Sequence, residues 1–284
     1  MSFEPVIPLG GMAGWAFLNR TFERQTEAFR ASGQTSQNTS YFRENIGKIT
    51  SATDLVADRR LLTVALGAFG LDDDIDKRFF IRKILEEGTV DTSAMANRLV
   101  DKRYARMAEA FGFDSKFGPR TRLDHVVSQM IASYETRQFE IAVGNQDQTL
   151  RLSLGFEREI ASIVERASSD NSAWYGILGN PPVRKVVTDA FNLPSAFTAL
   201  DLDRQVETLK DKTQGLYGSD KASVLTIPSN TQDLVRRYLV QAVNTGSSIN
   251  TSGQSSALAI LRGGSVGINS TTTLEALFSA LYSK

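Results

Sequence analysis

The chain has 284 residues, enough for one large domain or two of ordinary size. Its 32 lysines and arginines equal its 32 aspartates and glutamates, so the formal net charge is zero. This balance argues against a nucleic-acid partner or an acidic membrane surface, because binding to either needs a basic surplus. The absence of cysteine excludes disulfides and thiolate metal sites, and the single histidine, His125, cannot form a histidine-rich metal site. We expect no cofactor and no metal.

The N-terminal 18 residues are apolar and rich in glycine, but they carry Glu4 where a secretory signal needs basic residues. The longest uncharged run, residues 238–261, contains too many serines, threonines and asparagines to cross hydrocarbon. We therefore predict no membrane insertion and no cleaved signal. The expected location is the cytoplasm, unless a route that needs no cleaved signal exports the chain.

Composition divides the chain into three parts. Residues 1–39 are expected to be an N-terminal helical arm with a polar stretch at 32–40 that predicts a loop. Residues 40–240 are expected to be a helical body. Residues 241–284 begin as a connector rich in serine, threonine and glycine and end in a helical pattern.

The body follows the helical period almost throughout. The clearest apolar face comprises Leu123, Val126, Val127, Met130, Ile131 and Tyr134. Ile141 is expected to continue this face, and Gly144 is a natural end. Strand alternation is limited to a short candidate at 224–227. The sequence therefore predicts an all-α, multi-helix bundle.

One helix end recurs along the chain. It occurs as Ala68-Phe69-Gly70-Leu71-Asp72, as Ala110-Phe111-Gly112-Phe113-Asp114 and, more loosely, as Ala190-Phe191-Asn192-Leu193. A helix that ends in a Schellman turn needs a left-handed residue, for which glycine is best and asparagine next. We predict positive φ at Gly70, Gly112 and Asn192, an internally repeated helix–Schellman-turn unit, and one core shared by the three helices.

Two groups could carry chemistry. The acidic run at 72–74 and Asp76 resembles a cation site, but the aspartates are consecutive, whereas a calcium loop alternates its ligands. Capping of the next helix start is the favoured interpretation. His125 follows Asp124 on a helix, where adjacent side chains diverge by about 100° and cannot form a triad. No catalytic residue is predicted.

Both ends of the chain carry apolar stripes. They consist of Trp15, Leu18, Phe22 and Phe29 in the first arm and of Leu274, Leu277, Phe278 and Leu281 in the second. Exposed apolar stripes are rarely left without a partner. The stripes either contact another protein or fold back on the body, and the sequence leaves both alternatives open.

Three stretches resemble a bacterial domain-of-unknown-function family encoded among flagellar genes, mostly in alphaproteobacteria. They are Asp54–Leu62 with Ala65–Leu71, then Phe80–Gly88, then Ala96–Leu99 through Tyr104 to Ala110–Phe113. The likeness covers roughly residues 40 to 240, and Asn192 departs from it where the pattern has glycine. The resemblance implies a helical protein associated with flagellar assembly or structure, and it brings no catalytic residues.

The leading hypothesis is a non-enzymatic helical interaction protein with protein partners, flagellar components among them. Its oligomeric state is not predicted. A carboxylate-based hydrolase is one alternative, because paired carboxylates can come from distant helices; it predicts a deep pocket lined by two such groups with raised pKa values. A helical bundle that binds a ligand in a buried apolar cavity is the other.

Overall fold

A computed structural model describes residues 3–246 of the chain. Within this range the secondary structure consists of α-helices and short 3-10 helices, without a strand, which confirms the all-α prediction. The α-helices are α1 (Gly11–Arg30), α2 (Gly33–Asn45), α3 (Ala52–Ala57), α4 (Arg59–Phe69), α5 (Arg78–Glu87), α6 (Met95–Arg98), α7 (Arg103–Phe111), α8 (Asp124–Gly144), α9 (Gln148–Glu165), α10 (Asp170–Leu178), α11 (Pro181–Ala190), α12 (Leu202–Tyr217) and α13 (Pro228–Gly246). The 3-10 helices are η1 (Ile46–Lys48), η2 (Asp72–Asp74), η3 (Arg120–Arg122), η4 (Ser195–Ala199) and η5 (Ala222–Thr226). The strand candidate at 224–227 was wrong, because η5 covers most of it.

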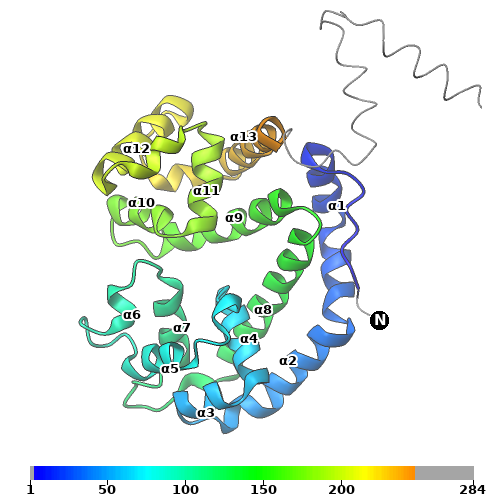
Figure 1. Cartoon of the computed structure of the whole chain (residues 1–284), viewed down its shortest axis with the longest axis vertical. Helices are drawn as coiled ribbons and strands as arrows, with labels where there is room; N and C mark the ends of the chain where they lie inside the picture. Colours follow the sequence, from blue (N-terminus) through cyan, green and yellow to red (C-terminus); the bar gives the residue numbers. More distant parts are fainter. Residues whose placement is uncertain (1–2, 247–284) are drawn as a thin grey trace, which may run out of the picture. The chain divides into compact units, whose positions relative to one another are not determined.

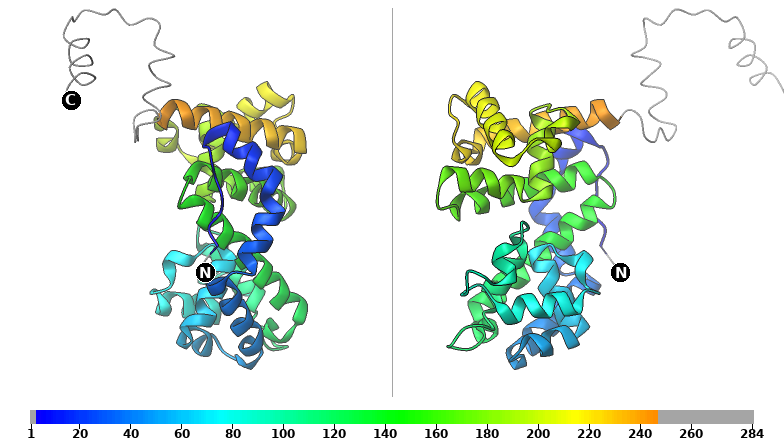
Figure 2. Two further views of the ribbon diagram at one scale, coloured as in Figure 1. Left: turned by 90° about the vertical axis from the view of Figure 1, so that its right-hand side faces the viewer. Right: turned by 60° about the vertical axis from the view of Figure 1, so that its left-hand side comes forward.

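The helices surround two separate hydrophobic cores (Figure 1). The first core contains buried residues from Phe42 to Tyr134 and is formed by α2 to α7 with the first half of α8. The second core contains buried residues of α1 and those from Phe139 to Leu239. Helix α8 runs from one core to the other, and α1 packs against α8 and α9 (Figures 1 and 2).

Helix α8 changes its buried face where it passes between the cores. Its first half buries Val127, Met130, Ile131 and Tyr134 of the predicted stripe in the first core. Leu123, the expected first residue of that stripe, precedes the helix and is exposed. Its second half buries Phe139 and Val143 in the second core, whereas Ile141, the expected continuation of the stripe, is only half-buried. One helix with two phases of burial explains why a single periodic pattern fails to describe it.

The polar stretch at 32–40 forms most of α2, so the predicted loop was wrong. Serine, threonine and asparagine have low intrinsic helix propensity, which is why the sequence suggests a loop. Tertiary contacts supply the stability instead. Phe42 is fully buried, and the Asn38 amide donates a hydrogen bond to the Tyr134 hydroxyl over 3.1 Å. Contacts group the described residues up to Asn244 in one compact unit, in which α1 of the expected N-terminal arm packs against α8 and α9.

The three predicted corners all have left-handed backbone, with φ of 72° at Gly70, 59° at Gly112 and 51° at Asn192. Two of them are Schellman turns. The Leu71 amide donates to the Leu66 carbonyl over 3.0 Å, and the Leu193 amide donates to Thr188 over 2.9 Å. Gly112 closes the simpler left-handed cap.

The prediction of one shared core was wrong. Helices α4 and α7, which end at Gly70 and Gly112, pack in the first core, whereas α11, which ends at Asn192, packs in the second. A left-handed corner is determined by the last turn of its own helix, and that turn carries no information about which neighbours the helix will meet. The recurring helix end is therefore a local feature, and the helices that carry it lie in two different cores.

The sequence predicted that the acidic run at 72–74 caps the next helix, and this prediction was wrong. The run forms η2, and α5 begins only at Arg78. Asp74 instead accepts hydrogen bonds from the Tyr104 hydroxyl and Lys77, and Asp72 accepts one from Gln138 over 2.8 Å. In residues 3–246 no group of three or more acidic or histidine side chains is arranged to hold a metal ion.

Candidate functional site

The N-terminal stripe faces the interior of the protein. Trp15, Leu18 and Phe29 are buried in the second core, and Phe22 and Phe29 both form T-shaped ring contacts with Phe139, with centroids 5.6 and 5.7 Å away. The hypothesis that these residues contact a partner is therefore corrected, and the alternative that they fold back on the body holds. The C-terminal stripe of Leu274, Leu277, Phe278 and Leu281 lies outside the described residues.

A groove with exposed apolar side chains lies beside the Asn192 corner. We call it the corner groove; its volume is about 700 Å³ and it lies between the first turn of α1, the end of α11, α12 and α13. Met12 is 42% exposed, Leu216 is 38% exposed and Val240 is 48% exposed. Three exposed apolar side chains from three helices therefore line one groove, and exposed apolar groups gathered in this way mark binding sites.

The path of α11 places the corner beside this surface. Asn180 caps the helix by accepting a hydrogen bond from the Val183 amide, and the prolines at 181 and 182 supply the fixed φ of a helix start. At the other end, Phe191 is buried under the turn and Asn192 is exposed on the groove wall. The turn thus closes the second core and shapes one wall of the groove.

Basic side chains dominate the rim of the groove. Lys212, Arg236 and Arg237 line it, and Asp233 forms ion pairs with Arg237 at 2.6 Å and with Arg236 at 3.4 Å. Burial would raise the pKa of Asp233, but the hydrogen bond and charge of Arg237 lower it. Burial and the Asp233 charge raise the pKa of Tyr217, which donates to Asp233, to about 12. Asp233 thus pairs with two of the three cations that line the groove, and the rim stays positive.

A buried group of charged side chains joins α7, α8 and α9 where the two cores meet. We call Arg106, Arg137, Glu140, Arg158 and Glu159 the ion cluster. Glu159 pairs with Arg106 at 3.1 Å, with Arg158 at 2.5 Å and closely with Arg137, and it also accepts a hydrogen bond from Asn180 over 3.2 Å. Burial would raise the pKa of Glu159, but the charges of the three arginines hold it at about 2.

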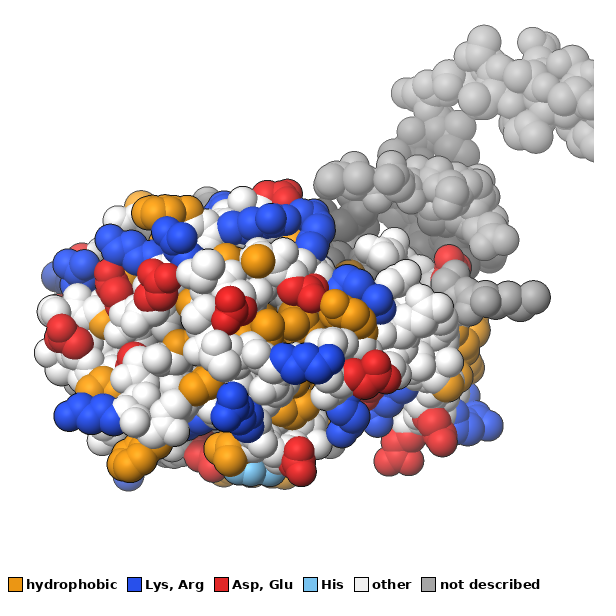
Figure 3. Space-filling model, turned by 90° about the horizontal axis from the view of Figure 1, so that it is seen from below, with side chains coloured by type: hydrophobic (Ala, Val, Ile, Leu, Met, Phe, Trp, Pro, Cys, Tyr) orange, Lys and Arg blue, Asp and Glu red, His pale blue; other side chains and the backbone are white. Residues whose placement is uncertain are grey.

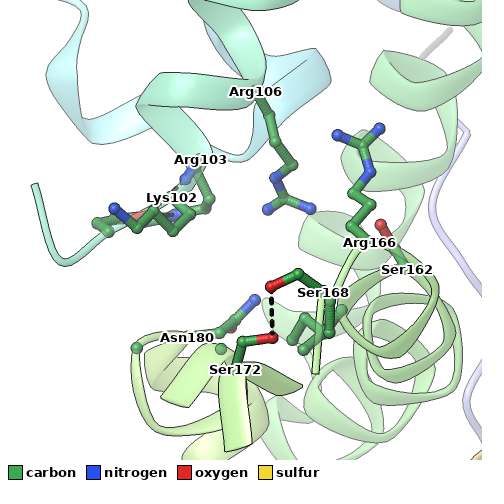
Figure 4. A pocket seen from close by; sticks show the side chains of 13 residues that line it. Lys102, Arg103, Arg106, Ser162, Arg166, Ser168, Ser172 and Asn180 are labelled. Atoms are coloured by element: carbon green, nitrogen blue, oxygen red, sulfur yellow. Dashed lines mark hydrogen bonds and ion pairs between the residues drawn. The ribbon is translucent and has the colours of Figure 1, made fainter. Parts of the chain in front are cut away.

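A second hollow, which we call the basic pocket, lies next to the ion cluster, between the start of α7 and the turn from α9 to α10. Its volume is about 240 Å³. Figure 4 shows Arg106 extending towards Ser168 and Ser172 on the opposite wall, with Ser162 near Arg166. Its cations are Lys102, Arg103, Arg106 and Arg166.

The hydrolase alternative expects a pocket lined by two carboxylates with raised pKa values. One pocket is lined by both Glu140 and Glu157. Burial raises the pKa of Glu157. Glu140, however, accepts hydrogen bonds from Arg158 on both oxygens, over 3.1 and 3.0 Å. A carboxylate held at both oxygens by a guanidinium is a poor acid or base, so this pair does not favour hydrolysis. His125 is exposed on the first turn of α8, away from this pocket.

Surface charge follows the neutral composition. On the face drawn in Figure 3, basic and acidic side chains are interspersed, with apolar side chains between them. No helix within residues 3–246 combines the length and the apolar character needed to cross a bilayer.

Comparison with known proteins gives a family and a structural relative. The model of a family described as "Protein of unknown function (DUF1217)" matches residues 68–224, more than half of the chain. The chain belongs to this family. It is also similar to the crystal structure of Protein AGR_C_984 from Agrobacterium tumefaciens, with a TM-score of 0.69 and 26% sequence identity over 85% of this chain and 99% of the other. None of the curated proteins compared with the chain matches it.

The DUF1217 match contains the left-handed corners, the ion cluster and the basic pocket. It also contains one wall of the corner groove, at Asn192 and Leu216, while Met12 and Val240 lie outside it. Sequence reasoning missed both hollows, because their residues come from helices far apart in the chain. The ion cluster had a signal of its own, since Glu140 and Glu159 interrupt helix faces that are otherwise apolar.

Proposed function

We propose that this DUF1217 protein is a non-enzymatic interaction protein, associated with flagellar assembly or structure, that binds a helix of a partner protein in the corner groove. The observation that carries the proposal is the apolar surface of Met12, Leu216 and Val240 beneath a positive rim. A partner helix with an apolar face and acidic flanks would complement both features.

The size of the surface supports a helical ligand. An amphipathic helix docks through a few large side chains spaced over two turns, and it needs a groove bounded by other helices. The corner groove is bounded by α1, α11, α12 and α13 and has a volume of about 700 Å³. Its exposed apolar residues belong to three different elements, so a partner would be held from several sides.

The flagellar association rests on the resemblance of the motifs in α3 to α7 and on no feature of the groove. The two parts of the proposal therefore need separate tests. Deletion of the gene is expected to impair swimming or filament assembly. Unchanged swimming and unchanged filaments in the deletion strain would contradict the flagellar part.

The groove is tested by polar substitutions in the full chain. Met12→Gln and Leu216→Gln remove apolar anchors that are already partly exposed, so the fold should persist. Each is expected to weaken retention of the partner in co-purification about tenfold, because an interface anchor contributes about 1–2 kcal/mol. Val90→Gln and Phe79→Gln are matched controls, since both residues are exposed apolar side chains that do not line the groove. Equal losses in groove and control variants would contradict the proposal.

Truncations separate the groove from the C-terminal stripe. Residues 1–30 cannot be removed as a test, because Trp15, Leu18 and Phe29 are part of the second core. Removal of residues 272–284 leaves every described residue in place. We expect this truncated chain to retain the partner if the groove is the binding surface. Loss of the partner in this chain alone, with both groove variants binding normally, would assign the contact to the C-terminal stripe.

A further inference from the structure

We propose that the basic pocket binds a small phosphorylated molecule through its phosphate monoester group. The pocket is separate from the corner groove, and this inference does not depend on the proposed interaction function. It rests on the number, the placement and the charge balance of the donors around a hollow of about 240 Å³.

Donors reach the hollow from three directions. Lys102, Arg103 and Arg106 come from the start of α7, Arg166 from the end of α9, and Ser168 and Ser172 from the turn and first residues of α10 (Figure 4). Three of these already donate within the chain: Lys102 to the Asn97 carbonyl, Arg103 to Asp101 and the Gly70 carbonyl, and Ser172 to the Ser169 carbonyl. Arg106, Arg166 and Ser168, one from each wall, are the donors left for a ligand. A carboxylate presents two oxygens in one plane, whereas a phosphate monoester presents three acceptor oxygens spread in space. Donors on three walls fit the second geometry.

The acidic side chains nearby are already paired. Asp101, the pocket's one lining carboxylate, holds Arg103 in a forked ion pair with contacts of 3.0 and 2.7 Å. Glu159 is shared by three arginines of the ion cluster. With Glu140, two carboxylates face the three arginines of that cluster, so one positive charge is left beside the pocket. Burial and the charge of Arg158 lower the pKa of Arg137, as expected where cations crowd together.

Two arginines at the pocket have unused donor capacity. Arg106 gives one hydrogen bond to Glu159, and its buried Nε has no hydrogen-bond partner among the described residues. Buried donors are normally satisfied, so an arginine in this state points to an acceptor that is supplied from outside the chain. Arg166 is 60% exposed and lies 3.8 Å from Glu109, a pair of exposed charges that contributes little. Its guanidinium can therefore turn onto a bound phosphate.

Close helix packing brings the serine wall into position. A Cβ at Gly176 would lie 2.8 Å from Cγ2 of Ile163, so α10 approaches α9 more closely than another residue would allow. This approach places Ser172 of α10 and Ser162 of α9 at the same hollow. The volume is below the usual range for drug-sized ligands, about 300–1,000 Å³, which favours a small ligand.

Calorimetric titration of the full chain tests the site, with O-phosphoserine and inorganic phosphate as probes and serine as the unphosphorylated comparison. We expect binding of both phosphates and none of serine, and stronger binding of O-phosphoserine would identify an ester as the preferred form. Arg166→Gln is expected to weaken binding about tenfold, the effect of one charge-assisted hydrogen bond. Arg59→Gln, at a similarly exposed and paired arginine remote from the pocket, should change nothing.

A variant that is expected to strengthen phosphate binding excludes unfolding as the cause of the weaker binding of the other variants. Asp101→Asn removes the carboxylate from the pocket and should tighten phosphate binding about fivefold. Absence of any binding at a probe concentration of roughly 10 mM would overturn the proposal, because a specific site would have a far lower dissociation constant. Equal weakening by Arg59→Gln and Arg166→Gln would overturn it as well, since the phosphate would then be responding to net charge alone.

Discussion

The Gly70 and Asn192 corners have the same backbone and different surroundings. Both are left-handed, and both close with the paired hydrogen bonds of a Schellman turn. The Gly70 corner is covered: Arg103 donates a hydrogen bond to its carbonyl, and Arg137 of the ion cluster packs against its Cα. The Asn192 corner is exposed and forms a wall of the groove.

This difference separates what a local pattern determines from what it does not. Three or four residues are sufficient to end a helix in a left-handed turn. Whether that turn becomes part of the interior or part of a binding surface depends on side chains that arrive from elsewhere in the chain. At Gly70 these are arginines with buried partners, and at Asn192 they are the exposed apolar residues of α1, α12 and α13.

The largest expected loss of stability comes from breaking the ion cluster, whose Arg137 packs against the Gly70 corner. Glu159→Ala would leave three arginines without their shared carboxylate, and breaking such a buried group destabilises a protein by about 3–5 kcal/mol. Urea denaturation measures the loss. Glu109→Ala is the matched control, because its exposed pair with Arg166 contributes about 0–1 kcal/mol. Similar stabilities of the two variants would show that the cluster does not hold the corner.

Acid should reproduce part of this effect. The pKa of Glu159 is lowered in the folded state from 4.5 to about 2, so its contribution to stability is complete above pH 4.5 and is lost as the pH falls towards 2. The loss is about 3 kcal/mol, as the size of the pKa shift implies. Denaturation at several pH values should give a flatter curve for Glu159→Gln than for the original chain. Parallel curves would contradict the assignment.

Gly70→Ala should have a smaller effect, confined to the covered corner. An L residue in left-handed backbone is destabilised by about 1–2 kcal/mol, and the new Cβ would lie 2.6 Å from Nη1 of Arg137. We expect a total loss of roughly 2–3 kcal/mol in the free energy of unfolding. Asn192→Ala is the matched substitution at the exposed corner. If Gly70→Ala lowers the free energy of unfolding by less than Asn192→Ala does, the arginines that cover Gly70 add nothing to the destabilisation.

The smallest effect is expected at the open corner. Asn192→Gly keeps the left-handed turn and removes a side chain that makes no buried contact, so stability should change by no more than about 0.5 kcal/mol. Thermal denaturation and partner binding, measured on the same preparation, check this. A large loss of stability would show that Asn192 supports the turn through more than its backbone.

The features that could be predicted from the sequence are those set within a few residues. The three left-handed corners and the all-α class follow from glycine, asparagine and helical spacing close to each site. The polar helix α2 could not be predicted, because its stability comes from contacts such as that of Asn38 with Tyr134, nearly a hundred residues away. The division into two cores could not be predicted either, because it also depends on contacts between residues far apart in the chain.

The candidate sites were still less accessible to sequence reasoning. The corner groove combines Met12 with Leu216 and Val240, and each of them alone is an unremarkable apolar residue on an amphipathic helix. The N-terminal stripe looked like a better contact surface and is part of the core. Only the fold shows which of two similar apolar faces is already covered.

The most direct test of the interaction surface is photocrosslinking in native cells. A photoreactive phenylalanine analogue is placed at Leu216 in the corner groove, and in a second strain at Val90, which is equally apolar and more exposed. We expect an adduct with a flagellar component, identified by mass spectrometry, at position 216 and not at 90. An adduct only at position 90, or none at 216, would contradict it.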